Sequence, residues 1–216
     1  MVTALVLTLC LSCAMTHVQD PASNGMSRVH FSIDQAGDLS QEQLTRAIDQ
    51  VRQIWRSAGI AVSAGRYGEP APPDATRISL RMVYVKHSVD HTVVLAWTTM
   101  APDRRLAPAL FVSVPGLTEL LSTADVKGRP FNQRPRELRD RLLGQAIGRV
   151  TAHELGHFLL QRAGHADQGL LRPRYSTADL IEPWLHPFEV AVADRQIVRR
   201  EVANLARLQA GMRGER

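Results

Sequence analysis

The chain has 216 residues, a formal net charge of +5 and 44% hydrophobic residues. That length is enough for one domain with a sizeable core, and the composition is that of a globular protein rather than a disordered one. The positive charges are scattered among acidic residues with little aromatic interleaving, which argues against a nucleic-acid partner. An association with anionic polymers of a cell envelope is left open.

The first fourteen residues form an apolar run that is too short to span a bilayer comfortably. Ser12 and Ala14 give the small-x-small pattern of a cleavage site, so residues 1–14 are predicted to be an export signal. Such signals usually start with positive charges, which are missing here. A true initiator methionine further upstream is therefore an open alternative. The alternative is a lipoprotein site at Cys13. Both cysteines, Cys10 and Cys13, lie in this leader region, so no disulfide is expected.

A β-α-β unit is predicted next. The strand at 28–33 alternates between polar and apolar residues. Ser40 and Gln43 form a capping box that begins a helix, and Gly59 ends it. Because extended chain resumes directly after that glycine, the two strands are expected to form a parallel pair.

Two or three further strands are expected before the Arg- and Pro-rich connection at 127–136, and an amphipathic helix is expected to close the chain at 187–208. Since no repeat or second-domain linker is apparent, residues 28–216 are predicted to be a single domain that follows a flexible segment at 15–27. The candidate strands lie at 77–85, 92–97 and 109–114, and the last ends at Pro115-Gly116.

The run Thr151-Ala-His153-Glu154-Leu-Gly-His157 gives the most specific functional signal in the chain. Residues four apart on a helix share one face, so His153 and His157 can direct two imidazole nitrogens at one metal ion. Glu154 is rotated away from that face, a position that suits a general base acting on metal-activated water. These polar side chains would be costly in an apolar helix without partners. The sequence therefore predicts a Zn²⁺ site with hydrolytic chemistry.

A hydrolytic zinc site usually has three protein ligands, so a third donor has to come from beyond the helix. His165 is the first candidate, because Gly164 can take the left-handed turn that ends a helix and lets the chain fold back. Glu182 and Glu189 are rivals, since some zinc peptidases recruit a glutamate from a later helix. His186 is a weaker rival.

The segment resembles the active-site helix of metzincin-type zinc metallopeptidases, whose pattern is His-Glu-x-x-His-x-x-Gly-x-x-His followed by a methionine-containing turn. Leu160 stands at the glycine and His165 comes two residues late, so the helix is expected to run about half a turn longer. Residues 165–172 are also similar to a shorter pattern of exported bacterial proteins that contain His-Glu-Leu-Gly-His, with Leu171 in the methionine's place. The resemblance implies that Leu171 is an apolar floor beneath the metal. Tyr175 matches an aromatic position of that pattern and is expected to pack rather than to reach the substrate.

Periodicity alone predicts an α+β or α/β layer. The resemblance implies the α+β form, a twisted mixed β-sheet of four to five strands packed on the early helix and the zinc-binding active-site helix, with a C-terminal helix. It also implies that the strand at 92–97 or the strand at 109–114 borders the substrate cleft and pairs with an extended peptide.

The expected function is that of an exported zinc-dependent peptidase, an endopeptidase with a peptide or protein substrate. His153, His157 and His165 would hold Zn²⁺, and Glu154 would be the catalytic general base. The alternative is a secreted, non-catalytic zinc-binding domain with a peptidase-like fold. Glu154 argues against it, because a structural site has no use for a carboxylate there. A basic envelope-binding protein without a metal ranks last, since it leaves the helical histidines unexplained.

Overall fold

The structure is a computed structural model, and it describes residues 26–34, 38–89, 92–103, 105–126, 128–183 and 188–214. The predicted export signal, with both cysteines, and nearly all of the predicted flexible segment lie outside these ranges. Within the described part of the chain, no helix has the length and apolar character needed to cross a membrane.

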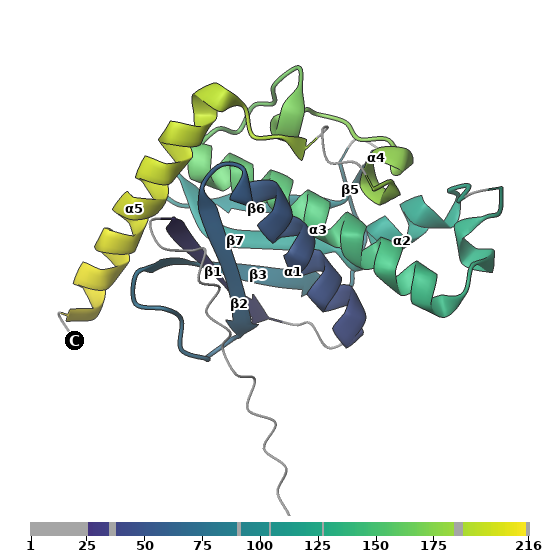
Figure 1. Ribbon diagram of the computed structural model, residues 1–216, viewed down its shortest axis with the longest axis horizontal. Coiled ribbons are helices and arrows are strands. Elements are labelled where there is room, and N and C mark those ends of the chain that lie inside the picture. Colours follow the sequence, from purple (N-terminus) through teal and green to yellow (C-terminus); the bar gives the residue numbers. More distant parts are fainter. Residues whose placement is uncertain are drawn as a thin grey trace, which may run out of the picture.

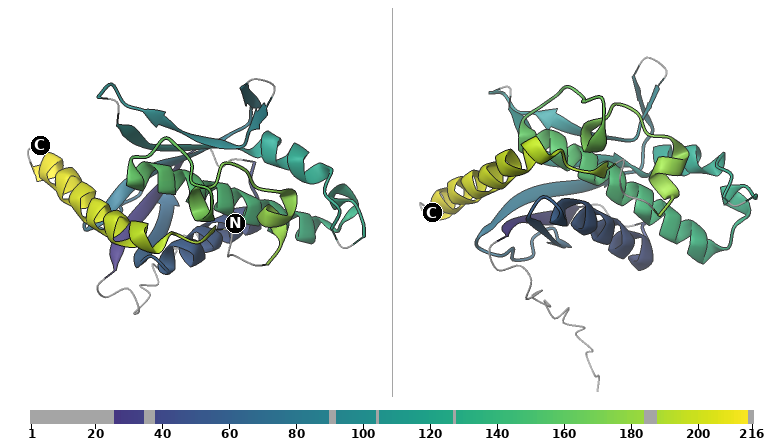
Figure 2. Two further views of the ribbon diagram at one scale, coloured as in Figure 1. Left: turned by 90° about the horizontal axis from the view of Figure 1, so that it is seen from above. Right: turned by 45° about the horizontal axis from the view of Figure 1, so that its top comes forward.

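A five-stranded sheet in the order β2-β1-β3-β7-β6 forms the centre of the molecule (Figure 1). β2, β1, β3 and β7 run parallel to one another, whereas β6 is antiparallel to β7. A separate antiparallel hairpin, β4–β5, projects away from the sheet (Figure 2). This mixed sheet confirms the predicted fold class. The strands are β1 Ser27–Asp34, β2 Ile60–Arg66, β3 Ala75–Val83, β4 His87–Val89, β5 Thr92–Val94, β6 Ala96–Met100 and β7 Leu106–Ser113.

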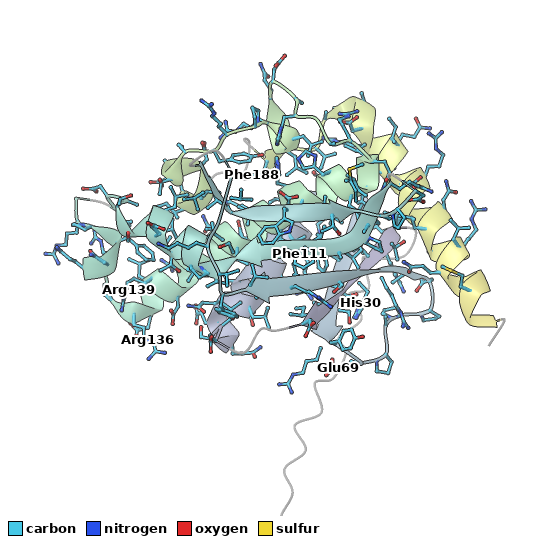
Figure 3. The ribbon with its side chains drawn as sticks, turned by 180° about the vertical axis from the view of Figure 1, so that it is seen from behind. His30, Glu69, Phe111, Arg136, Arg139 and Phe188 are labelled. Atoms are coloured by element: carbon cyan, nitrogen blue, oxygen red, sulfur yellow. The ribbon has the colours of Figure 1, made fainter. Side chains whose placement is uncertain are left out.

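Helices cover one face of the sheet. α1 and α3 lie side by side in front of the strands in Figure 1, whereas from behind the strands and Phe111 face the viewer (Figure 3). α5 packs across one end against β1, β3 and α3, and it begins and ends later than the predicted helix at 187–208, whose first residue lies outside the described ranges. The helices are α1 Gln41–Arg56, α2 Val114–Ser122, α3 Arg136–Leu160, α4 Thr177–Ile181 and α5 Val192–Gly214, with short 3-10 turns η2 Phe131–Gln133 and η3 Gly169–Leu171.

The β-α-β unit forms from the local signals that predict it. The Gln43 N–H donates to the Ser40 side chain at 3.2 Å, and the Ser40 N–H donates to the Gln43 side chain at 2.9 Å, so the capping box begins α1. Gly59, with a φ of 77°, then turns the chain from α1 into β2. β2 pairs in parallel with β1, with Ile60 opposite Ser27, as predicted.

α1 and α3 approach to backbone contact because α3 carries glycine at two contact positions. A β-carbon on Gly148 would lie 2.3 Å from the carbonyl oxygen of Ala47, and one on Gly144 would lie 2.5 Å from that of Gln43. No side chain fits at either position. The close approach helps to bury α3 without interruption from Leu142 to Leu159, so the histidine motif lies in the interior.

Two details between β3 and α3 differ from the sequence-based expectation. The strand expected at 92–97 is two strands that part at Leu95, because β5 pairs with β4 while β6 pairs with β7. The sequence predicts only a strand end at Pro115-Gly116, but α2 begins there. The Gly116 N–H donates to the Ser113 side chain, and Pro115 occupies the first turn, where its missing N–H costs nothing.

Gly148→Ala tests the contact between the two helices. The added methyl group meets a backbone oxygen, so we expect the free energy of unfolding to fall by about 2 kcal/mol or more, although alanine is the better helix former by about 1 kcal/mol. Gly211→Ala in α5 is the control, because a β-carbon there meets nothing within 4 Å. Urea denaturation compares the two variants, and equal stability would show that no backbone contact exists.

Candidate metal centre

Two turns of α3 bring His153 and His157 together inside the protein. Their ring centroids lie 4.6 Å apart at an interplanar angle of 79°, and their Nε2 atoms approach to 2.9 Å. Both side chains are buried, with exposed fractions of 8% and 6%. The predicted pairing of these two histidines on one helix face is therefore present.

Each ring is held through its other nitrogen by a backbone carbonyl from the chain beyond α3. His153 Nδ1 lies 2.6 Å from the Leu170 oxygen, and His157 Nδ1 lies 2.6 Å from the Arg162 oxygen. Since a carbonyl only accepts, each Nδ1 carries the hydrogen and each Nε2 of a neutral ring has a free lone pair. This is the orientation in which histidines bind metal ions.

Burial keeps both rings neutral. Desolvation, followed by the neighbouring His157, lowers the pKa of His153 to about 4, and desolvation also lowers the pKa of His157. Two neutral rings then point lone pairs at each other, an arrangement that a cation between them would relieve. The separation of 2.9 Å is near the roughly 3.3 Å between donors that a tetrahedral zinc ion with bonds of about 2.0–2.1 Å requires. The residues present fit a metal ion.

His165 completes a cluster of three possible ligands. One ligand atom from each of His153, His157 and His165 lies within 4.8 Å of the others, and the His165 ring stands 4.9 Å from that of His157. His165 is exposed, so the cluster faces solvent on that side.

The rival glutamates lie outside this cluster. Glu189 is exposed, and its carbonyl oxygen accepts from the Leu170 N–H. The carbonyl oxygen of Glu182 accepts from Gln145, and neither glutamate belongs to the cluster. His186 lies outside the described residues.

The turn that delivers His165 differs from the expected one. α3 ends at Leu160, and Gln161, not Gly164, takes the left-handed conformation with a φ of 48°. The expectation that the helix runs about half a turn longer is therefore wrong. Glycine is the usual residue at such a position, which is why sequence reasoning selected Gly164. The chain folds back over α3 after this turn (Figure 2).

Glu154 is buried next to His153, with an exposed fraction of 8%. Desolvation raises its pKa to about 7, and a hydrogen bond from the backbone N–H of Thr98 in β6 opposes that shift. Burial therefore favours the protonated form of this carboxyl group, which lies between the histidine pair and the edge of the sheet.

Apolar and aromatic side chains support the histidines from the returning chain. Leu171 is buried, and its Cδ2 atom leaves no room for a β-carbon on Gly156, which would lie 2.9 Å away. The Tyr175 hydroxyl donates to the Leu170 oxygen that also holds His153, and its ring stacks on Phe188 at 4.6 Å. Burial raises the pKa of Tyr175 above its ordinary value. Both side chains therefore pack, as the sequence suggests.

Arg149 is a supporting residue that the sequence analysis did not identify. It is fully buried one turn before His153, where it donates to Gln50 of α1 and to the Asp179 carbonyl of α4. Its guanidinium also lies 5.1 Å from the centroid of Phe188. Burial lowers its pKa to about 10, so it stays charged. The only sign of this role in the sequence is that Arg149 lies four residues, about one helical turn, before His153.

Comparisons with known proteins find similarity among solved structures alone. No protein-family model matches the sequence, and no curated protein matches it. Among solved structures, the chain is similar to archaemetzincin from Methanopyrus kandleri, with a TM-score of 0.45 and 11% identity over 84% of this chain and 97% of that one. It is also similar to metalloproteinase-II from Bacteroides fragilis, with a TM-score of 0.41 and 12% identity over 82% of this chain and 53% of that one. It thus spans about half the length of the second protein.

Glu154→Gln should stabilise the metal-free protein in a pH-dependent way. Below about pH 4.5 the carboxyl group is protonated in both states; as pH rises, the unfolded chain ionises first, so the folded protein loses stability up to about pH 7. Glutamine removes this loss. The advantage of the variant in free energy of unfolding should grow across that window to at most about 3 kcal/mol and then level off. Guanidinium denaturation at several pH values measures it, and a constant difference would contradict the raised pKa.

His165→Ala should weaken zinc binding by at least about ten- to a hundredfold, because it removes one of three clustered donors. Glu182→Ala and Glu189→Ala serve as controls and should leave the affinity unchanged. Competition with a chromophoric chelator measures all three. An unchanged histidine variant together with a weakened glutamate variant would assign the third ligand to a glutamate.

Proposed function

We propose that this chain is a zinc-dependent peptidase. One observation carries the proposal: the Nε2 atoms of His153 and His157 converge at 2.9 Å while the buried Glu154 stands beside them. His165 is the third ligand in this proposal. Neutral imidazoles suit zinc, and a purely structural site would have no use for a buried carboxyl group next to its ligands.

In the proposed reaction Glu154 is the general base. A zinc ion, when bound, supplies Lewis acidity that polarises the scissile carbonyl and acidifies water. Glu154 accepts a proton from that water and afterwards delivers it to the leaving amine. Burial raises the pKa of this carboxyl group, which makes it a better proton acceptor, and the Thr98 N–H fixes the orientation of the carboxylate. The histidines remain neutral throughout.

The substrate is proposed to bind as an extended peptide along β6. β6 ends the strand order of the described sheet, so one of its edges is available for another strand. β7 lies between β3 and β6, which excludes the strand predicted at 109–114 as the cleft edge. Because Thr98 of β6 bonds Glu154, a peptide added to this edge would pass close to the general base.

We also propose that the protein acts outside the cytoplasm. The support is the apolar leader at 1–14, with Cys13 as an alternative lipid anchor. The net charge of +5 supports a further association with anionic envelope polymers.

Glu154→Gln should retain zinc and lower the turnover of a peptide library by about a hundredfold or more, because it removes the proton acceptor while keeping the shape. His153→Ala and His157→Ala should lose both the metal and the activity. Metal analysis and mass spectrometry of the cleaved library give the two readouts. Wild-type turnover in the glutamine variant would refute the mechanism. One zinc per wild-type chain without any cleavage would instead indicate the non-catalytic zinc-binding domain.

A further inference from the structure

The end of α3 has the geometry of a Schellman turn, with a glutamine where glycine is usual. The Gln161 N–H donates to the Phe158 oxygen at 3.2 Å, and the Arg162 N–H donates to the His157 oxygen at 3.1 Å. These bonds require the left-handed conformation that Gln161 adopts, which L-residues with a β-carbon rarely take.

This turn holds a histidine of the metal centre directly. The Arg162 carbonyl oxygen accepts the His157 Nδ1 hydrogen at 2.6 Å, and the Arg162 N–H donates to the His157 carbonyl oxygen. The conformation of Gln161 therefore decides where the Arg162 oxygen stands, and that oxygen decides the orientation and tautomer of His157.

The Gln161 side chain makes a second connection, to the strand pair beside the site. Its oxygen accepts from the Leu106 N–H at 2.8 Å, and its amide donates to the Leu106 oxygen at 3.3 Å and to the Phe158 oxygen at 2.8 Å. Leu106 begins β7 and pairs with Met100 of β6. The amide thus bonds both polar groups of one strand residue, as a neighbouring strand would.

We propose that Gln161 is a positioning residue that sets the metal-binding helix against the β6–β7 hairpin. Through its backbone it places the carbonyl that orients His157, and through its amide it holds the hairpin whose Thr98 N–H orients Glu154. A glycine would form the turn with less strain but would lose the side-chain hydrogen bonds to Leu106. The proposal rests on the proposed zinc peptidase function, but its metal-binding part is tested without hydrolysis.

Two substitutions separate the turn from the side chain. Gln161→Gly keeps the left-handed turn and removes the amide, whereas Gln161→Val removes the amide and also disfavours the turn, because a β-branched residue rarely takes this conformation. Gln168→Gly is the matched control, since it removes an exposed glutamine from the same returning segment at a residue with ordinary extended backbone.

The full chain is loaded with Zn²⁺ or Co²⁺ for each variant. We expect Gln161→Val to bind zinc about ten- to a hundredfold more weakly and to change the visible absorption of the cobalt protein, because the carbonyl that orients His157 is displaced. We expect Gln161→Gly to keep both properties and to raise KM for peptides, because only the bonds to the hairpin are lost. The control should match the wild type. Wild-type affinity, cobalt spectrum and KM in both variants would overturn the proposal, as would equal losses in the control.

The outcomes also separate this proposal from the proposed function. A wild-type chain that binds zinc but cleaves no peptide refutes the peptidase function, and the variants still test Gln161 by affinity and spectrum. A wild-type chain that cleaves peptides, with unaffected Gln161 variants, refutes only the role of Gln161. A wild-type chain that binds no metal refutes both.

Discussion

Two backbone carbonyl groups fix the candidate metal centre, and much of the surrounding structure serves to place them. The oxygens of Leu170 and Arg162 accept the Nδ1 hydrogens of His153 and His157, and so aim both Nε2 lone pairs at one point. Both carbonyls come from chain that follows α3. That segment therefore has to reverse at the end of the helix and return along it, and η3 and Tyr175 hold it there. The site is a property of the returning chain as much as of the helical motif.

Burial is the physical cause that gives the site its chemistry. Burial disfavours the charged form of each group. It therefore lowers the pKa of His153 to about 4 and raises that of Glu154 to about 7. The histidines become neutral donors, and the glutamate becomes a group that can both accept and release a proton near neutral pH. The contacts of the two groups come from different parts of the chain, since His153 bonds Leu170 of the returning segment and Glu154 bonds the Thr98 N–H of β6.

Local signals in the sequence predict much of this arrangement. The capping box at Ser40, the turn at Gly59 and the spacing of His153 and His157 each depend on neighbouring residues, and each has the predicted form. The features that sequence reasoning misses depend on distant partners. The division of the strand at Leu95 follows from which strand each half pairs with, and the buried charge of Arg149 depends on contacts with α1 and α4. No local pattern contains that information.

The energy of the turn at the end of α3 also depends on a distant partner. A left-handed residue with a β-carbon costs about 1–2 kcal/mol relative to a right-handed one, which is why the sequence favours Gly164. Gln161 offsets that cost with three side-chain hydrogen bonds, each worth about 0.5–1.5 kcal/mol, and two of them reach Leu106, 55 residues earlier in the chain. Leu160 stands at the glycine position of the resembled metzincin pattern. The left-handed residue, Gln161, therefore comes one residue later than that glycine. Three residues then separate it from His165, so a longer spacing between the histidines is compatible with a shorter helix. Where the left-handed residue falls, rather than the presence of a glycine, determines how the third histidine reaches the other two.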